Sequence, residues 1–317
     1  MSLVSLIVVL LLEQARPLPY QLFVRGPLAR LADFLEGHFN AGDHQHGTLA
    51  WLLAVVSLTL ASGLIFFALY QLNPLLAWAW NIFVLYLTMG FRQFSHHYTD
   101  IQLALRMGDI PHARRLLAEW RGRSADDLSS ADISRLSIEE ALSASHRHVF
   151  GVLFWFVLLP GPCGAVLYRV SAFLSEYWGS RQGSEVGKFG DFGDFGDFGK
   201  FAQQAFWIID WLPLRVTAAG FAIVGNFEDA IYCWRTQAGK WPDDGLGIVL
   251  ASGAGALGVR LGMPVVEAGE IADRAEIGTG DEADVDFMRS AVGLVWRALV
   301  LWLLLLLLLG LAGLVGG

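Results

Sequence analysis

The stretch Leu49–Leu72, LAWLLAVVSLTLASGLIFFALYQL, contains no charged residue and decides the fold class of this chain. A helix of this length crosses the hydrocarbon core of a bilayer, which is roughly 30 Å thick. Asn73 and Pro74 then predict a turn, and a second uncharged run, Leu75–Phe91, follows at once. We therefore expect a transmembrane helical hairpin over residues 49–91.

A third uncharged run, Ala298–Val315, lies near the other end of the chain and is preceded by Trp296 and Arg297. Such residues anchor helices at the membrane interface. Over the 317 residues, 55% are hydrophobic and 16% are charged, whereas about 25% of the residues in a soluble domain are charged. The mean hydropathy is +0.48. The sequence therefore predicts an all-α, polytopic integral membrane protein with a cytoplasmic helical insertion.

Two further apolar regions are interrupted. Residues 149–174 are broken by Pro160–Gly164, and proline in a membrane helix needs neighbouring protein to satisfy the backbone. This pattern predicts either a kinked span or a re-entrant hairpin. Residues 206–224 contain Asp210 and Arg215, and charges at membrane depth usually pair or line a cavity. We therefore expect a functional or interfacial segment there.

Basic residues flank both ends of the predicted hairpin, and the positive-inside rule places both flanks in the cytoplasm. The run Leu3–Leu12 is too short to span a bilayer, so residues 1–48 are predicted to form an interfacial segment. Residues 92–148 are predicted to be cytoplasmic helices. The sequence thus predicts a bacterial inner-membrane protein in contact with lipid, with no nucleic-acid partner. The flanking basic residues are Arg16, Arg25, Arg30, Arg92, Arg106, Arg114 and Arg115.

The net charge of −8 comes largely from the acidic run Glu267–Asp286, in which Arg274 is the only basic residue. We predict a solvated acidic linker over residues 265–290 and a C-terminal transmembrane helix over residues 291–317. Ahead of the linker, residues 149–264 are expected to form broken or re-entrant membrane segments.

Residues 188–201, KFGDFGDFGDFGKF, repeat Asp-Phe-Gly in tandem. A protein kinase uses one such motif to hold magnesium, together with a Gly-rich loop, a strand lysine and a His-Arg-Asp loop. The nearest approach to that loop, His146-Arg147-His148, lacks the aspartate. The three-residue period matches neither helix nor strand, and repeated glycine opposes both. We predict a flexible loop whose exposed Phe side chains rest on the membrane surface.

Other short motifs give weaker signals. GAGALG, Gly253–Gly258, fits a dinucleotide-binding pattern, but that reading needs a βαβ unit, and small residues also suit close helix packing. Cys163 and Cys233 are too isolated to predict a zinc site or a disulfide. Histidines one or two positions apart do not share a helix face, so no metal site is predicted. These histidines are His44 and His46, His96 and His97, and His146 and His148.

The stretch GDIPHARRLLAEWRGRSADDLSSADISRLSIEE, Gly108–Glu140, resembles the cytoplasmic helices of the CobD/CbiB family, the membrane-bound adenosylcobinamide-phosphate synthases of cobalamin assembly. Their pattern there reads, loosely, GDL..AR..L...VGRDT..L....I.RA.IE. GPCGAVLYR (residues 161–169), WLPLR (211–215) and AGALGVRLG (254–262) resemble later family elements in the same order. The resemblance implies ATP- and Mg²⁺-dependent amide formation between an aminopropanol-type phosphate and a corrinoid carboxylate.

The sequence departs from the family at positions where the synthases carry oxygen ligands. Ser124 and Ala125 replace the acid and threonine of GRDT, and Ser143 and Ala144 replace a Glu-Asn pair. Because Mg²⁺ requires oxygen donors, these replacements argue against the synthase chemistry. WIIDWLPLR, Trp207–Arg215, resembles the AmpE branch of the superfamily, which is linked to signalling for β-lactamase induction. An AmpE-like, non-catalytic regulatory or signalling role is the leading interpretation, and adenosylcobinamide-phosphate synthase is the alternative.

Polar residues that remain at family positions form the predicted pocket, with Asp210 and Arg215 as its floor. The opposing interpretation is structural pairing between helices. No catalytic residue and no metal or cofactor is assigned, since only the synthase alternative requires Mg²⁺ and ATP. The sequence leaves open a protein partner or a small metabolite as the bound species. The predicted pocket residues are Arg123, Glu139, Tyr168, Arg169, Asp210, Arg215 and Arg260.

Overall fold

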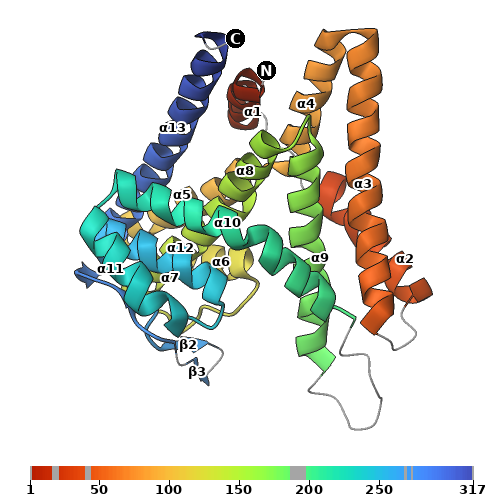
Figure 1. The fold of residues 1–317 in the computed structure, drawn as a ribbon. Coiled ribbons are helices and arrows are strands. Elements are labelled where there is room, and N and C mark those ends of the chain that lie inside the picture. Colours follow the sequence, from red (N-terminus) through yellow and green to blue (C-terminus); the bar gives the residue numbers. More distant parts are fainter. Residues whose placement is uncertain are drawn as a thin grey trace. The chain divides into compact units, whose positions relative to one another are not determined.

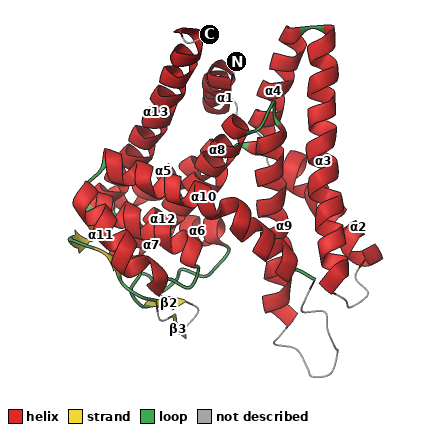
Figure 2. Ribbon diagram, viewed as in Figure 1, coloured by secondary structure: helices red, strands yellow, loops and turns green. Residues whose placement is uncertain are grey.

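The computed structural model describes residues 2–15, 21–39, 44–185, 198–267, 270–272 and 274–315. Helices dominate these residues and the strands are short (Figures 1 and 2). The predicted all-α, polytopic membrane fold is confirmed. The chain divides into two compact units, one built from Met1–Gly90 with Arg147–Leu212 and the other from Phe91–His146 with Pro213–Gly317.

Among its described residues the first unit contains helices joined by short turns, and no strand. It contains α1 (Ser2–Ala15), η1 (Gln21–Arg25), α2 (Gly26–Phe39), α3 (His44–Leu72), α4 (Pro74–Thr88), η2 (His146–Phe150) beyond its first residue, α8 (Gly151–Leu158), α9 (Cys163–Glu185) and, as far as Leu212, α10 (Lys200–Val224).

The predicted hairpin of residues 49–91 is present as α3 and α4. α3 is long enough to cross a membrane, whereas α4 is a shorter apolar helix. Its turn is fixed by Asn73, whose side-chain oxygen accepts a hydrogen bond from the backbone N–H of Leu75 at 2.8 Å. Pro74 takes the first position of α4, where a helix has no use for a backbone donor. Leu64 and Phe67 of α3 are 68% and 60% exposed. Such apolar surface suits contact with lipid.

The interrupted region at residues 149–174 folds as a tight helical hairpin. α8 ends at Leu158, and α9 starts again at Cys163 and packs back against α8. A side chain at Gly164 would overlap the backbone carbonyl of Trp155, so the two helix backbones are in contact there. Of the two predicted alternatives, a kinked span and a re-entrant hairpin, the structure has the hairpin geometry.

Most of the Asp-Phe-Gly repeat lies outside the described residues. Its last phenylalanine, Phe198, is described, and it is 5% exposed. The ring meets Trp178 edge-on, with 5.0 Å between ring centroids, and belongs to the core cluster that includes Trp51 and Leu174. The expectation of an exposed side chain is therefore wrong for Phe198, because this residue fills the core beside α3 and α9.

The second unit combines helices with short strands. Helices form most of residues 92–146, with turns at residues 107–109 and 122–129. Its elements are α5 (Phe91–Arg106), α6 (Ile110–Arg121), α7 (Ser130–Ser145), the part of α10 after Leu212, α11 (Phe227–Gln237), η4 (Ala238–Lys240), α12 (Asp244–Leu257), β1 (Val259–Leu261), β2 (Val265–Glu267), β3 (Glu270–Ala272), β4 (Ile277–Gly278), β5 (Asp281–Glu282) and α13 (Val285–Val315).

α5 and α13 are tied together by a long-range hydrogen bond in the core of the second unit. The buried hydroxyl of Tyr98 donates to the backbone carbonyl of Met288 at 2.7 Å. Burial raises the pKa of the Tyr98 hydroxyl well above its ordinary value. The hydroxyl therefore stays protonated and remains a donor over the physiological range.

The GAGALG motif belongs to a packed helix and its C-terminal cap. Most of it forms the end of α12, and Gly258, in the left-handed region at φ 68°, ends the helix. A side chain at Gly255 would overlap the backbone of Asp229 on α11. The predicted packing role is confirmed, and the strand-turn-helix context of a dinucleotide site is absent around these described residues.

Short strands occupy much of the segment that was expected to be a solvated acidic linker. β1 lies between antiparallel β4 and parallel β5, and β2 pairs with β3 in an antiparallel hairpin (Figure 2). Ile277 and Ala283 are buried, so this acidic segment contributes to the core of the unit. α13 begins at Val285, earlier than the predicted start at residue 291.

Within the described residues, four helical stretches are long and apolar enough to cross a membrane: His46–Leu72, Ser130–Leu158, Lys200–Val224 and Val285–Ala312. The first and last correspond to predicted spans. Ser130–Leu158 begins in the region predicted to be cytoplasmic, and 61% of its most apolar window is buried, against 17% for His46–Leu72 and 22% for Val285–Ala312. Burial against protein therefore accounts for much of its apolar character.

Candidate functional site

The predicted pocket residues are divided between the two units. Tyr168, Arg169 and Asp210 belong to the first unit, and Arg123, Glu139, Arg215 and Arg260 belong to the second. Asp210 and Arg215 lie on either side of Pro213 on α10, where the unit boundary also falls. Neither unit therefore contains both residues of the expected pocket floor.

The first cluster is a buried Tyr–Asp pair between α9 and α10. The hydroxyl of Tyr168 donates to Oδ1 of Asp210 at 2.9 Å, and the two residues are 0% and 5% exposed. Gly151 leaves the space that the Tyr168 ring fills. Arg169, the next residue on α9, is also buried. The acid expected at membrane depth thus accepts a hydrogen bond from a buried tyrosine hydroxyl.

Replacing Tyr168 with phenylalanine should lower the free energy of unfolding by about 1–3 kcal/mol, because a buried carboxylate loses a donor while the ring is kept. Asp210→Ala should lower it further, since the buried Tyr168 hydroxyl then loses its acceptor and the removed side chain leaves a cavity. Thermal unfolding of the purified protein in detergent measures both effects. The matched control is Tyr70→Phe, because Tyr70 is 48% exposed. A Tyr168→Phe protein as stable as this control would contradict the expectation.

The second cluster is centred on Glu139 of α7, which is 6% exposed. Its Oε1 accepts a hydrogen bond from the backbone N–H of Gly262 at 2.8 Å, and its Oε2 pairs with Nη1 of Arg274 at 2.6 Å. The Arg274 guanidinium also lies 5.6 Å from the centroid of the Trp241 ring. Sequence reasoning missed Arg274 because it was counted as part of a linker. One feature of the sequence could have indicated it: Arg274 is the only basic residue in that acidic run.

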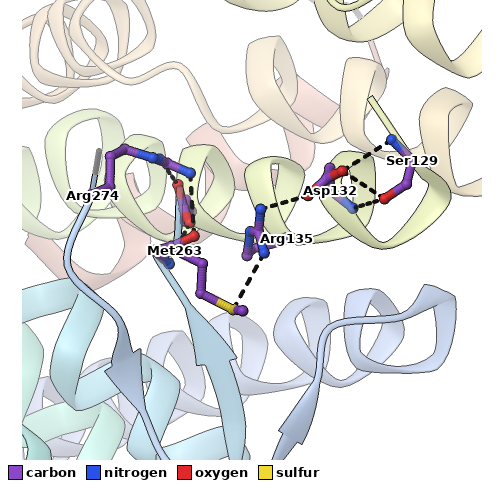
Figure 3. A network of polar contacts seen from close by, with 7 residues as sticks. Ser129, Asp132, Arg135, Met263 and Arg274 are labelled. Atoms are coloured by element: carbon purple, nitrogen blue, oxygen red, sulfur yellow. Dashed lines mark hydrogen bonds and ion pairs between the residues drawn. The ribbon is translucent and has the colours of Figure 1, made fainter. Parts of the chain in front are cut away.

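The same face of α7 carries a second polar chain, shown in Figure 3. Ser129 and Asp132 form a capping box that begins the helix. Asp132 Oδ1 also accepts from Nη2 of Arg135 at 2.5 Å, and Nη1 of Arg135 donates to Sδ of Met263 at 3.4 Å. α7 therefore presents two buried charges, Arg135 and Glu139, to the turn that follows β1.

The remaining predicted residues of the second unit lie in more open positions. Arg260 of β1 pairs with Glu276 at 3.6 Å, and their side chains are 40% and 50% exposed. An exposed pair of this kind contributes little stability. Arg123 is exposed and Arg215 is half-buried. The structure thus draws Glu139 into a buried network but leaves Arg123 at the surface.

The donor set does not fit the magnesium and ATP chemistry implied by the family resemblance. No group of three or more His, Cys, Asp or Glu side chains that could hold a metal ion is found among the described residues. His96 pairs with Asp100 at 3.5 Å and His97 stacks on Trp120, so each of these histidines has a separate contact. We therefore derive no reaction step through a metal or a nucleotide.

Comparison with known proteins identifies the family. The profile described as "CobD/Cbib protein" matches residues 10–295. The cobalamin biosynthesis protein CobD of Stutzerimonas stutzeri is 36% identical over 282 residues, which cover 88% of each chain. CobD of Chromobacterium violaceum is 34% identical over 262 residues, or 81% of this chain and 77% of that protein. The cobalamin biosynthesis protein CbiB of Salmonella typhimurium is 24% identical over 245 residues, or 74% of this chain and 72% of that protein. No solved structure matches the chain. With most of its length matched in this way, the chain belongs to the CobD/CbiB family.

Proposed function

We propose that this protein acts in cobalamin biosynthesis as an adenosylcobinamide-phosphate synthase, joining an aminopropanol-type phosphate to a corrinoid carboxylate. The observation that carries the proposal is the 36% identity, across 88% of both chains, to a relative named for cobalamin biosynthesis. This favours the synthase alternative over the AmpE-like interpretation, because the relatives described above are all named for cobalamin biosynthesis.

The proposed reaction forms an amide bond between the amine nitrogen of one substrate and the carboxylate carbon of the other. One carboxylate oxygen and two amine hydrogens leave as water, so the atoms balance. Both substrates carry anionic groups, which arginine recognises well because its guanidinium donates two parallel hydrogen bonds. Arg135 and Arg274, the arginines beside the Gly262–Met263 turn, have this chemistry. The role proposed for them is to bind and orient an anionic substrate.

A non-catalytic role, as in the AmpE-like interpretation, is the second candidate. It is favoured by the replacement of oxygen ligands with Ser124, Ala125, Ser143 and Ala144, and by the lack of a metal-binding group among the described residues. A regulatory protein would bind a metabolite or protein partner without turnover.

Complementation separates the two candidates. We expect this gene to restore growth on cobyric acid to a bacterial strain that lacks its own synthase. Cobinamide already carries the aminopropanol arm, so growth on cobinamide should not depend on the gene and serves as the control. Failure to grow on cobyric acid, with the protein present in the membrane fraction, would reject the synthase proposal and leave the non-catalytic role.

We further propose that the protein resides in the bacterial inner membrane, with residues 92–148 on the cytoplasmic side and lipid around α3 and α13. The exposed leucines of these helices support lipid contact. Cysteine-accessibility labelling of single cysteines placed between residues 100 and 135 tests the orientation. Labelling of these positions by an impermeant reagent added outside intact cells would overturn it.

A further inference from the structure

Arg135 is a buried cation with too few hydrogen-bond acceptors. The residue is 3% exposed. Its Nη2 donates to Asp132, its Nη1 reaches only the sulfur of Met263 at 3.4 Å, and its buried Nε has no hydrogen-bond partner. A guanidinium has five N–H donors, and a thioether sulfur is a weak acceptor. Because buried charges are normally fully hydrogen-bonded, Arg135 has unused capacity for an oxygen ligand.

Met263 covers this arginine in a strained conformation. Its φ is 67°, and it is the one non-glycine residue among those described with a positive φ. The left-handed backbone is unfavourable for a residue that has a Cβ atom, and strain of this kind concentrates at ligand clamps and switches. The Met263 side chain is half-buried and points its sulfur at Arg135 (Figure 3). Met263 therefore contacts a buried guanidinium while remaining partly accessible to solvent.

A second arginine lies at the same turn. Nη2 of Arg274 donates to the backbone carbonyl of Gly262 at 3.4 Å, and its Nε is also buried without a hydrogen-bond partner. The turn of Gly262 and Met263 thus contacts one guanidinium through its carbonyl and another through its sulfur. Asp132 pairs with Arg135, and Glu139 pairs with Arg274. In both arginines the Nε atom still has no hydrogen-bond partner.

We propose that Arg135 binds the phosphate group of a ligand, and that the Met263 side chain occupies the position of that group until the ligand displaces it. Phosphate oxygens form short, charge-assisted hydrogen bonds with arginine. They would satisfy the donors that the sulfur leaves unsatisfied. The phosphate could belong to an aminopropanol-type phosphate or to ATP. That choice of source rests on the proposed function, whereas the site itself rests on the geometry.

Binding of inorganic phosphate to the full-length protein in neutral detergent, followed by calorimetry, tests the site directly. Arg135→Lys should weaken binding about tenfold or more, because hydrogen bonds from a charged donor are lost. Met263→Ala should tighten binding by roughly tenfold, because the ligand no longer has to displace a side chain. Competition by aminopropanol phosphate and by metal-free ATP then distinguishes the two sources.

Arg289→Lys and Met107→Ala are the matched controls, because both residues are exposed and neither change should alter the Kd. If Arg135→Lys does not fold, Met263→Ala decides the question alone. No phosphate binding by either the wild type or Met263→Ala, or a Kd that Met263→Ala leaves unchanged, would overturn the proposal. Complementation measures turnover and not phosphate binding. A protein that binds phosphate through Arg135 but fails to complement would therefore support the phosphate site and reject the synthase proposal.

Discussion

Replacing Glu139 with alanine is expected to lower the free energy of unfolding by about 3–5 kcal/mol, because removal of one partner from a buried ion pair leaves the other charge uncompensated. The uncompensated charge here is Arg274, whose side chain is 15% exposed. The backbone N–H of Gly262 loses its acceptor in the same change. Losses of this size are a large fraction of the total stability of a domain, so less folded protein should be recovered from membranes.

Thermal unfolding and size-exclusion chromatography in detergent measure this effect. Glu119→Ala is the matched control, because Glu119 is exposed on α6 and its loss should change stability by less than about 0.5 kcal/mol. The double change Glu139→Met with Arg274→Met should recover much of the loss, since apolar pairs often replace buried ion pairs without cost. A double variant no more stable than Glu139→Ala would show that the charge is not the cause.

Gly164→Ala is expected to be comparably damaging in the first unit. The new methyl group would overlap the carbonyl and backbone of Trp155, and backbone cannot rotate away as a side chain can. Forcing extra volume into a packed contact commonly costs about 1–3 kcal/mol and occasionally more. We expect the upper end of this range, because the hairpin of α8 and α9 has to open before the methyl group fits.

The control for this change is Gly293→Ala on α13, where an added methyl group meets nothing within 4 Å. In a helix interior that substitution should be neutral or stabilising, by about 0.5–1 kcal/mol. Both variants can be compared by their unfolding temperatures in detergent. If Gly164→Ala unfolded at the wild-type temperature, α8 and α9 would not be in backbone contact in the folded protein.

The parts of the fold that the sequence predicted well are those fixed by local patterns. The hairpin of α3 and α4 and the C-terminal helix follow from uncharged runs, and the turn at Asn73 follows from capping chemistry. β4 and β5 could not be predicted, because strands of two residues are too short to show a period. Phe198 was misplaced because its position in a repeat suggested exposure, whereas contact with Trp178 buries it.

The candidate site was predicted only in part, because its contacts join distant positions. Glu139 was selected on family resemblance, but its partner Arg274 lies 135 residues further along the chain. Arg135 lies within the stretch Gly108–Glu140 that resembles the family, but it is not among the predicted pocket residues. Two observations identify Arg135: its Nε lacks an acceptor, and the neighbouring Met263 has a positive φ. Both are properties of the folded structure, so composition and residue spacing cannot predict them.

The interleaving of the two units affects how the protein is made. The chain leaves the first unit at Gly90, returns to it at Arg147 and leaves it again after Leu212. The ribosome therefore releases about a third of the second unit before the first is complete. The second unit cannot form the Tyr98 hydrogen bond until α13 has been made, because α13 supplies the Met288 carbonyl that accepts it. Neither unit can be expressed as one uninterrupted fragment. A nascent chain stalled ahead of α13 would leave unpaired core surface for insertion factors and membrane proteases to recognise.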